Sequence, residues 1–170
     1  VSQVNNYLKN IKLDIRNLSK LKKTIKRLKP DFVFHLAAQA LVKEAFLNPI
    51  KTWETNVLGT INVLESLKEI KKKCVVIIIT SDKCYKNLEI NRGYKENDIL
   101  GGSDPYSASK ASAELAIKSY LESFINLKKS NLIVGIARAG NVIGGGDWSK
   151  DRLIPDCIKS WSINKKVKIR

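Results

Sequence analysis

Three short apolar segments alternate along the chain with longer stretches in which apolar residues recur at every third or fourth position. The short segments, at 31–38, 74–80 and 131–137, are apolar at most positions, which is typical of strands buried on both faces. Strands of this kind, when separated by helices of a dozen residues or more, favour a parallel sheet covered by helices on both sides. The hydropathy pattern therefore predicts an α/β protein.

Helix boundaries follow from prolines and capping residues. The apolar stripe that begins at Leu18 ends before Pro30, which cannot continue a helix. Asn48 and Asp104 are each followed by a proline, a combination that is typical of an N-cap and a first helical turn. The expected helices lie at about 18–29, 49–71, 105–124 and 152–161. Residues 84–104 are polar and contain glycines, which predicts a long surface loop with a function.

Lysine accounts for most of the net charge of +15, which arises from 31 basic and 16 acidic residues. The lysines between 20 and 29 fall on the outer face of the first expected helix, and Lys71–Lys73 fall where a helix C-terminus favours cations. No pattern of aromatic and basic residues typical of a nucleic-acid-binding sheet accompanies this charge. We therefore expect solvated helix faces and no nucleic-acid partner.

The three cysteines form no CxxC pair and no cluster with His35, the one histidine, so we expect free thiols and no metal site. His35 falls within an apolar strand and is expected to be a hydrogen-bonded core side chain. No apolar run approaches the roughly 20 residues that cross a bilayer, and no signal segment is visible. We expect a cytosolic protein without a membrane partner.

Polar residues follow the second apolar strand abruptly, as Ser81, Asp82 and Lys83. In parallel sheets, ligands gather beyond the carboxyl ends of the strands. Tyr106 and Lys110 stand at i and i+4, on one face of the helix that begins at Asp104. A nearby ammonium stabilises a phenolate, so Tyr106 is a candidate to take a proton from a sugar hydroxyl that Ser81 also binds.

This set of residues resembles the serine, tyrosine and lysine of the short-chain dehydrogenase/reductase superfamily, in the extended branch that acts on nucleotide sugars. Further matches are DIR at 14–16, HLAAQ at 35–39, TNVLGT at 55–60 and RAGNVIG at 138–144. The resemblance implies a Rossmann-like, doubly wound parallel sheet with helices on both faces, and NAD as cofactor. By the same resemblance, the cofactor-binding residues are expected to be Asp14, Ile15, Leu36, Ala37, Ala38, Gln39, Asn56, Thr80, Tyr106 and Lys110.

Two of these expectations also have a physical basis. The small side chains of Ala37 and Ala38 let a cofactor approach the backbone, although close packing of a strand end would favour them as well. Asn56 is expected to hold a backbone carbonyl or a water molecule near Lys110; the alternative is a partly exposed helix asparagine.

Asp82 and Lys83 distinguish members of the branch. A 4,6-dehydratase oxidises C4 of the sugar, removes water across C5 and C6, and reduces C6, so it needs one group to take the C5 proton and another to protonate the leaving hydroxyl. The pair Asp82-Lys83 is similar to that of the CDP-glucose 4,6-dehydratases, as are the stretches 80–87, 100–110 and 139–156. This implies Lys83 as the base, made neutral by burial and neighbouring cations, and Asp82 as the acid.

The alternative for Asp82 and Lys83 is a solvated ion pair at the strand end. The resemblance implies an enzyme that acts on CDP-glucose. Its product would be a precursor of the deoxysugars found in molecules such as lipopolysaccharide. Two other functions stay open: another NAD-dependent epimerase or dehydratase for dTDP-, GDP- or UDP-sugars, and a non-catalytic binding module.

Glycines at 144–146 permit backbone turns that present N–H groups to phosphates. The resemblance implies that Asn141 and Arg152 contact the substrate diphosphate and that Leu153 belongs to the same site. A merely flexible loop is the alternative.

The glycine-rich turn that holds a dinucleotide pyrophosphate is absent from the sequence. Its expected place lies before Val1, and the C-terminal substrate lobe of the resembled family would follow Arg170. We therefore interpret residues 1–170 as the central part of one NAD-binding domain, with the start of the substrate-binding region at about 141–170. Without the turn, NAD cannot be distinguished from NADP. A homodimer formed through the helices after Asn48 and Asp104 is expected from the resemblance.

Overall fold

A computed structural model describes residues 7–125, 130–149 and 151–167. Residue contacts divide the chain into two units. The larger unit is Lys12–Gly140, and the smaller unit combines Val1–Ile11 with Asn141–Arg170. The sheet and the candidate catalytic residues belong to the larger unit, whereas Asn141, Arg152 and Leu153 belong to the smaller one. The predicted roles of these regions stay predictions.

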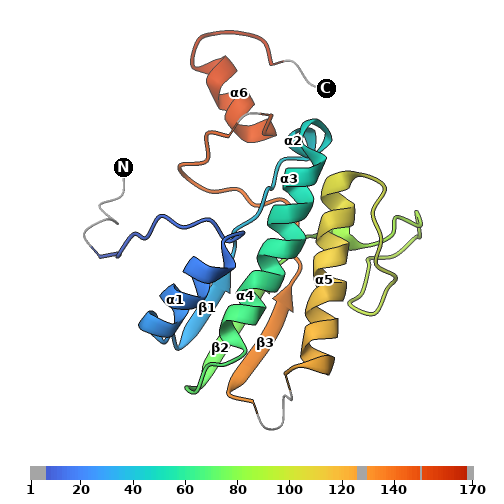
Figure 1. The fold of residues 1–170 in the computed structure, drawn as a ribbon. Helices are drawn as coiled ribbons and strands as arrows, with labels where there is room; N and C mark the ends of the chain where they lie inside the picture. Colours follow the sequence, from blue (N-terminus) through green and yellow to red (C-terminus); the bar gives the residue numbers. More distant parts are fainter. Residues whose placement is uncertain (1–6, 126–129, 150, 168–170) are drawn as a thin grey trace. The chain divides into compact units, whose positions relative to one another are not determined.

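The larger unit contains a parallel sheet of three strands (Figure 1): β1 (Phe32–His35), β2 (Cys74–Ile79) and β3 (Leu132–Ala137). The strand order is β1-β2-β3, so β2 is central. Phe32 lies opposite Val75, and Cys74 lies opposite Leu132. The three predicted strands and their parallel pairing are confirmed. Their carboxyl ends share one edge of the sheet, where Ser81 follows β2.

Six α-helices are described. They are α1 (Leu18–Leu28), α2 (Val42–Leu47), α3 (Pro49–Trp53), α4 (Gly59–Leu67), α5 (Pro105–Ser123) and α6 (Leu153–Trp161). A π-helical turn, Glu54–Leu58, joins α3 to α4, and a 3₁₀ turn, Asp82–Cys84, follows β2. The four predicted helical regions are confirmed, although the second ends at Leu67 rather than near 71. Helix α2 and the two special turns were not predicted.

The two predicted N-caps behave differently. Asp104 caps α5 as expected, because its carboxylate accepts hydrogen bonds from the backbone N–H of Tyr106 and of Ser107, at 2.9 and 3.0 Å. Asn48 occupies the cap position before Pro49, but its side chain makes no capping bond. Its amide donates instead to the carboxylate of Glu44 at 2.8 Å, since α2 ends immediately before it.

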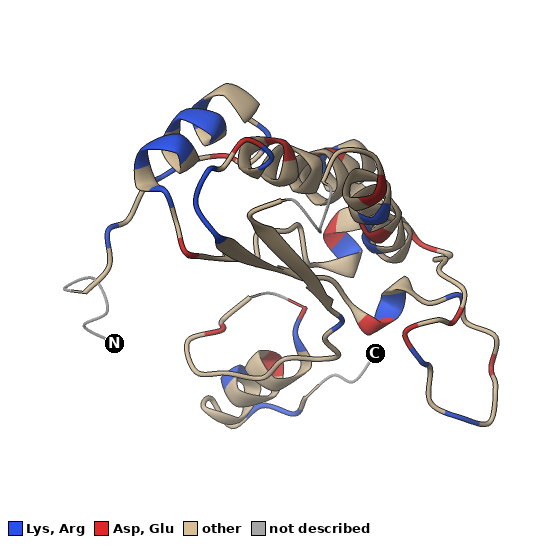
Figure 2. Ribbon diagram, turned by 90° about the horizontal axis from the view of Figure 1, so that it is seen from below, with Lys and Arg blue, Asp and Glu red and all other residues tan. Residues whose placement is uncertain are grey.

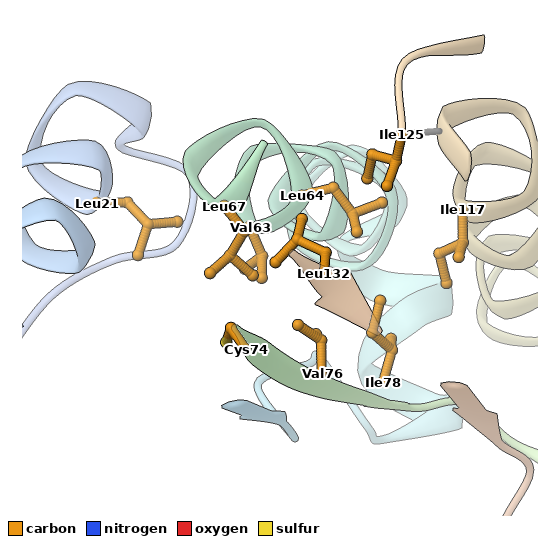
Figure 3. Packing of buried hydrophobic residues seen from close by; sticks show 10 residues of the cluster. All are labelled: Leu21, Val63, Leu64, Leu67, Cys74, Val76, Ile78, Ile117, Ile125 and Leu132. Carbon is orange, nitrogen blue, oxygen red and sulfur yellow. The ribbon is translucent and has the colours of Figure 1, made fainter. Parts of the chain in front are cut away.

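Helices α1, α4 and α5 lie on the same side of the sheet (Figure 2). Their apolar side chains meet those of β2 and β3 in one cluster (Figure 3). Burial alternates along β2, where Cys74, Val76 and Ile78 face this cluster. The buried residues of the cluster are Leu21, Val63, Leu64, Leu67, Cys74, Val76, Ile78, Ile117, Ile125 and Leu132. Each large apolar side chain buried here contributes about 1.5–3 kcal/mol.

The second face of the sheet is also apolar. Phe32 and Phe34 are 66% and 64% exposed, and Ile133 is 49% exposed. Among the described residues of Lys12–Gly140, the helices cover one face of the sheet, whereas the sequence pattern predicted cover on both. The Rossmann-like class is unaffected, because the parallel strand order and the helical connections define it.

His35 is a core side chain, as predicted. It is 7% exposed, and its Nε2 lies 3.0 Å from the hydroxyl oxygen of Thr60. Thr60 donates its only hydroxyl proton to the carbonyl oxygen of Asn56, at 2.7 Å, so His35 is the donor to Thr60. Burial lowers the pKa of His35 to about 4, with a further contribution from the charge of Lys110. His35 is therefore neutral at pH 7.

In the part of the chain that the structure describes, no helix has the length and apolarity needed to span a membrane. Cys74, Cys84 and Cys157 are free thiols.

Candidate active site

The chain continues to pair with β3 beyond the end of β2. The N–H of Thr80 donates to the carbonyl of Ala137 at 2.9 Å, and the N–H of Asp82 donates to the carbonyl of Ala139 at 3.0 Å. These bonds fix Ser81, which is 6% exposed, at the carboxyl edge of the sheet. The position predicted for Ser81 is confirmed, and its role in binding substrate stays a prediction.

Ser81 also caps the 3₁₀ turn that follows it. Its hydroxyl oxygen accepts a hydrogen bond from the N–H of Lys83 at 3.2 Å, and the hydroxyl donates to the carboxylate of Asp82 at 3.1 Å. This turn presents the side chains of Asp82 and Lys83 to solvent, where both are exposed. The expected burial of Lys83 is therefore wrong, because the capped turn directs its side chain outward together with that of Asp82.

Helix α5 carries the other two candidate catalytic residues. The Nζ of Lys110 donates to the carbonyl oxygen of Ile79 at 3.3 Å, so its amine lies at the end of β2. Lys110 is 7% exposed, and burial lowers its pKa. Tyr106, in the first turn of α5, is 9% exposed, and its hydroxyl makes no hydrogen bond to any described residue. The phenol therefore has no partner among the described residues that a ligand would have to displace.

An open cleft of about 820 Å³ lies between the 3₁₀ turn, the two ends of the loop 84–104 and the N-terminus of α5. Its walls are formed by Asp82, Lys83, Tyr85, Lys86, Asn87, Tyr94, Gly101, Gly102, Ser103, Asp104 and Ser107. Ser81 and Tyr106 adjoin lining residues in the chain without lining the cleft themselves. The structure thus brings Asp82 and Lys83 into one cleft and places the buried Lys110 on the adjacent helix.

Charges in the cleft influence one another. No ion pair joins Asp82 to Lys83 among the described residues, so the alternative of an ion pair at the strand end is not observed. Although burial favours the neutral acid at Asp104, hydrogen bonds from Ser107 and Tyr106 and the charge of Lys83 together lower its pKa. The cap of α5 is therefore a carboxylate.

Asn56 lies in the π-helical turn and clamps the segment that follows β1. Its side-chain oxygen accepts from the N–H of Gln39 at 2.8 Å, and its amide donates to the carbonyl of Gln39 at 3.0 Å and to the hydroxyl of Ser109 at 2.9 Å. Asn56 is 2% exposed. It holds a backbone carbonyl, as predicted. Because Asn56 is buried, the alternative of a partly exposed helix asparagine is wrong. Turns of this helical type occur often at functional sites.

The segment after β1 is open on the side away from Asn56. Leu36 is 67% exposed, Ala37 is exposed and Ala38 is half-buried. Gln39 is held further by its own side chain, which donates to the hydroxyl of Thr52 at 3.0 Å. The backbone at the end of β1 is thus rigid and accessible, which fits the prediction that a cofactor approaches it.

Asp14 and Ile15 are placed differently from each other. Asp14 is exposed and forms an ion pair with Arg16 at 2.7 Å, and the hydrogen bonds from Arg16 lower the pKa of Asp14 to about 2. Ile15 packs on α4, where a side chain at Gly59 would lie 2.5 Å from its Cδ1. A side chain at position 59 would therefore displace that of Ile15, a reason for the glycine that its motif alone did not reveal.

Thr80 has a structural partner. Its hydroxyl donates to the carboxylate of Glu114 at 2.6 Å, and Glu114 also binds Arg138 at 2.6 Å. Sequence reasoning assigned Thr80 to the cofactor and overlooked Glu114 and Arg138. The signal for Glu114 is its position four residues after Lys110, on the same face of α5.

Asn141, Arg152 and Leu153 lie in the smaller unit. Arg152 is the N-cap residue of α6, and its Nε is buried without a hydrogen-bond partner among the described residues. Asn141 and Leu153 are exposed. Gly146 adopts a φ of 86°, so the glycine run forms a turn that other residues would strain to adopt.

The parallel strand order and the helical connections define a Rossmann-like α/β domain, and ionisable residues follow its central strand at the carboxyl edge of the sheet. The family model described as GDP-mannose 4,6 dehydratase matches residues 1–141, and the chain belongs to this family. This confirms the resemblance to the extended short-chain dehydrogenase/reductases.

Individual relatives agree with this assignment. The chain is 49% identical to a CDP-glucose 4,6-dehydratase of Salmonella typhimurium, over 92% of this chain and 45% of the relative. It is 36% identical to a dTDP-D-glucose 4,6-dehydratase of Dictyostelium discoideum, over 88% of this chain and 35% of the relative. The chain thus spans less than half the length of these relatives.

A solved structure shows the same fold. It is a dTDP-glucose 4,6-dehydratase from Streptomyces venezuelae with NAD bound, which matches with a TM-score of 0.74 and 25% identity. The match covers 89% of this chain and 44% of that chain.

Proposed function

We propose that the protein is an NAD-dependent sugar-nucleotide 4,6-dehydratase that converts CDP-glucose to its 4-keto-6-deoxy product. The observation that carries this proposal is the pair Asp82 and Lys83, which lines a cleft immediately after Ser81 at the carboxyl end of β2. The 49% identity to a CDP-glucose 4,6-dehydratase supports the choice of nucleotide. The helix that carries Tyr106 and Lys110 borders the same cleft.

Tyr106 accepts the proton of the C4 hydroxyl in this reaction. Its own hydroxyl makes no hydrogen bond to a described residue, and Ser81 lies at the strand end to bind the same substrate oxygen. The ammonium of Lys110 stabilises the phenolate, because a positive charge near a phenol favours its ionised form. The carbonyl of Ile79 holds that ammonium in place.

NAD, when bound, would supply the hydride acceptor for oxidation at C4 and, once reduced, the hydride donor for C6. The residues proposed to hold it are those at the ends of β1 and β2, where Leu36, Ala37 and Ala38 expose backbone that Asn56 fixes through Gln39. Asp14 and Ile15 would border the adenosine portion. The rigid, accessible backbone after β1 is the feature that fits a cofactor.

The neutral amine of Lys83 takes the C5 proton, and the protonated carboxyl of Asp82 gives its proton to the C6 hydroxyl, which leaves as water. Both side chains are exposed on the cleft wall, so binding of the sugar must remove water from them. The Ser81 hydroxyl, which donates to Asp82, can shift to the substrate when it binds. In this arrangement residues of α5 serve the oxidation step, and residues of the 3₁₀ turn serve the elimination step.

Asn141 and Arg152 are proposed to contact the nucleotide diphosphate, and Leu153 is proposed to belong to the same site. The buried Nε of Arg152, which has no partner among the described residues, supports an anionic ligand there.

We infer further that the protein is a cytosolic homodimer without a nucleic-acid or membrane partner. Leu58, on the turn before α4, and Leu115, on α5, are 53% and 56% exposed, and apolar residues of this kind favour pairing of these helices between subunits. Sedimentation of the full-length protein tests this: a monomer at micromolar concentration would contradict it.

The proposed activity is tested by supplying the full-length protein with CDP-, dTDP-, GDP- and UDP-glucose. We expect a product with the alkaline absorbance of a 4-keto sugar from CDP-glucose. Conversion of another nucleotide would correct the substrate. An epimer that retains the C6 hydroxyl would make the protein an epimerase, and lack of any conversion would favour a binding module.

A further inference from the structure

A buried ion pair joins helix α5 to the end of β3. Glu114 and Arg138 have side-chain exposures of 3% and 17%, and Arg138 Nη2 lies 2.6 Å from Glu114 Oε2. The Nε of Arg138 adds a second bond to Glu114 Oε1 at 2.9 Å. This forked geometry fixes both side chains. Because desolvating such a pair offsets much of its attraction, its main effect is to select one arrangement of the elements that it joins.

The segment after β2 lies against the same carboxylate. Thr80 donates its hydroxyl to Glu114 Oε1 at 2.6 Å, and Thr80 directly precedes Ser81. Cys84, in the turn after Ser81, is buried close to Glu114: burial and the neighbouring charge of Glu114 raise the pKa of its thiol to about 12, so the thiol stays protonated. Glu114 is thus bound by the residue that precedes Ser81, and it lies close to Cys84 at the other end of the segment that carries Asp82 and Lys83.

Arg138 uses its remaining surface to hold the loop 84–104. Its Nη1 donates to the carbonyl oxygen of Glu96 at 3.0 Å, and its guanidinium carbon lies 4.5 Å from the centre of the Tyr85 ring. Tyr85 in turn stacks on Tyr94, with ring centres 5.0 Å apart. Both tyrosines line the cleft. One guanidinium therefore connects the sheet edge, helix α5 and the cleft wall.

The position of Glu114 on α5 relates the ion pair to the proposed chemistry. Tyr106, Lys110 and Glu114 follow one another at steps of four residues and are all buried on one face of the helix. The ion pair thus lies two helical turns from Tyr106 and does not reach the cleft itself.

We propose that Arg138, held by Glu114, is a positioning residue. It fixes the positions of the 3₁₀ turn and of the cleft wall at Tyr85, so that Asp82 and Lys83 are correctly placed relative to Tyr106 and Lys110. The proposal rests on the dehydratase function proposed above. The loop is closed on itself by bonds from the N–H of Lys86 to Ile99 and from the N–H of Gly101 to Cys84, both at 2.8 Å. Arg138 adds the connection between this closed loop and the end of β3.

The test compares three variants of the full-length protein with the wild type. Arg138→Lys keeps the charge but loses the forked geometry. Glu114→Gln combined with Arg138→Met removes both charges, so no unpaired buried charge prevents folding. Glu65→Gln is the control, because Glu65 forms an ion pair with Lys68 at 2.9 Å on α4, away from the cleft.

Two measurements are made, hydrogen exchange at the amides of Lys86 and Gly101 and steady-state kinetics at a temperature where every variant is folded. In the double variant we expect exchange about tenfold faster or more and kcat lower by about tenfold to a hundredfold with little change in KM. Arg138→Lys should give intermediate values, and Glu65→Gln should match the wild type in both.

Unchanged exchange at the two amides in the double variant would overturn the proposal, as would faster exchange with unchanged kcat. Should the wild type convert no nucleotide sugar, the dehydratase function fails by itself. The exchange measurement then decides alone whether Arg138 fixes the cleft wall, so the two claims fail separately.

Discussion

The Nζ of Lys110 donates a hydrogen bond to the carbonyl oxygen of Ile79, 3.3 Å away. This bond holds the buried amine of α5 at the end of the strand that leads into Ser81. The helix and the strand tip are thereby fixed together, which is the arrangement that proton transfer from a substrate hydroxyl to Tyr106 requires.

Replacing Tyr106 by Phe should abolish the oxidation step without unfolding the protein. Because the phenol makes no hydrogen bond to a described residue, we expect a change in the free energy of unfolding below about 1 kcal/mol. The value of kcat should fall by about 10²–10⁴. Kinetics and urea denaturation check this, and a variant with more than half of the wild-type kcat would exclude Tyr106 as the base.

Replacing Lys83 by Met should separate the two halves of the reaction. Oxidation at C4 relies on Tyr106 and should continue, so reduced cofactor accumulates on the enzyme, while elimination falls by about 10²–10⁴. Lys86→Met is a matched control, because Lys86 lines the same cleft without an assigned role. The absorbance of the reduced nicotinamide follows the first half of the reaction. Equal losses in both lysine variants would contradict the role of Lys83.

Replacing Asn56 by Ala should destabilise the segment after β1. The change removes three buried hydrogen bonds and leaves the N–H and carbonyl of Gln39 unpaired. We expect a loss of about 2–4 kcal/mol in the free energy of unfolding and weaker cofactor binding. Asn62→Ala, which removes one bond to the carbonyl of Ile15, is the control and should cost about 1 kcal/mol. Denaturation of both variants, together with cofactor titration, measures the difference.

Replacing Gly102 by Ala should displace the C-terminal end of the loop 84–104. A Cβ at Gly102 would lie 2.4 Å from the backbone nitrogen of Ala108, whereas one at Gly93 would meet nothing within 4 Å. Gly102→Ala should therefore cost at least about 1–3 kcal/mol in stability, and Gly93→Ala should be nearly neutral. Thermal unfolding compares the two, and similar melting temperatures would show that the loop does not pack on α5 as described.

Stability should depend on pH through His35. Its pKa is lowered from 6.5 to about 4 in the folded protein, so between these values the unfolded chain binds the extra proton. Stability is therefore complete above pH 6.5 and falls as the pH drops toward 4, by up to roughly 3 kcal/mol. His35→Gln should flatten this part of the profile. Urea denaturation from pH 7 to pH 4 measures it, and identical slopes for the two proteins would contradict the buried neutral imidazole.

Most of the fold could be predicted because its signals are local. The apolar runs of the strands, Pro30, and the cap formed by Asp104 and Pro105 each depend on a few neighbouring residues. Helix α2 escaped prediction, since Leu41 provides no side-chain cap and the helix is only six residues long. The π-helical turn at Glu54–Leu58 also escaped it, because one widened turn barely alters the apolar period.

The site was predicted less completely, because its support comes from distant residues. Ser81 and Lys110 could be assigned from their motifs. The exposure of Lys83 depends on the turn that Ser81 caps, and the ion pair of Glu114 with Arg138 joins residues that only the folded sheet brings together.

The most direct test of the central claim is the reaction of CDP-glucose with the full-length protein in D₂O. A group of the protein that takes the C5 proton exchanges it with the solvent before a proton is returned to C5. We therefore expect a 4-keto product that has lost the C6 hydroxyl and carries deuterium at C5. A product that retains the C6 hydroxyl, or that contains no solvent deuterium at C5, would contradict the account.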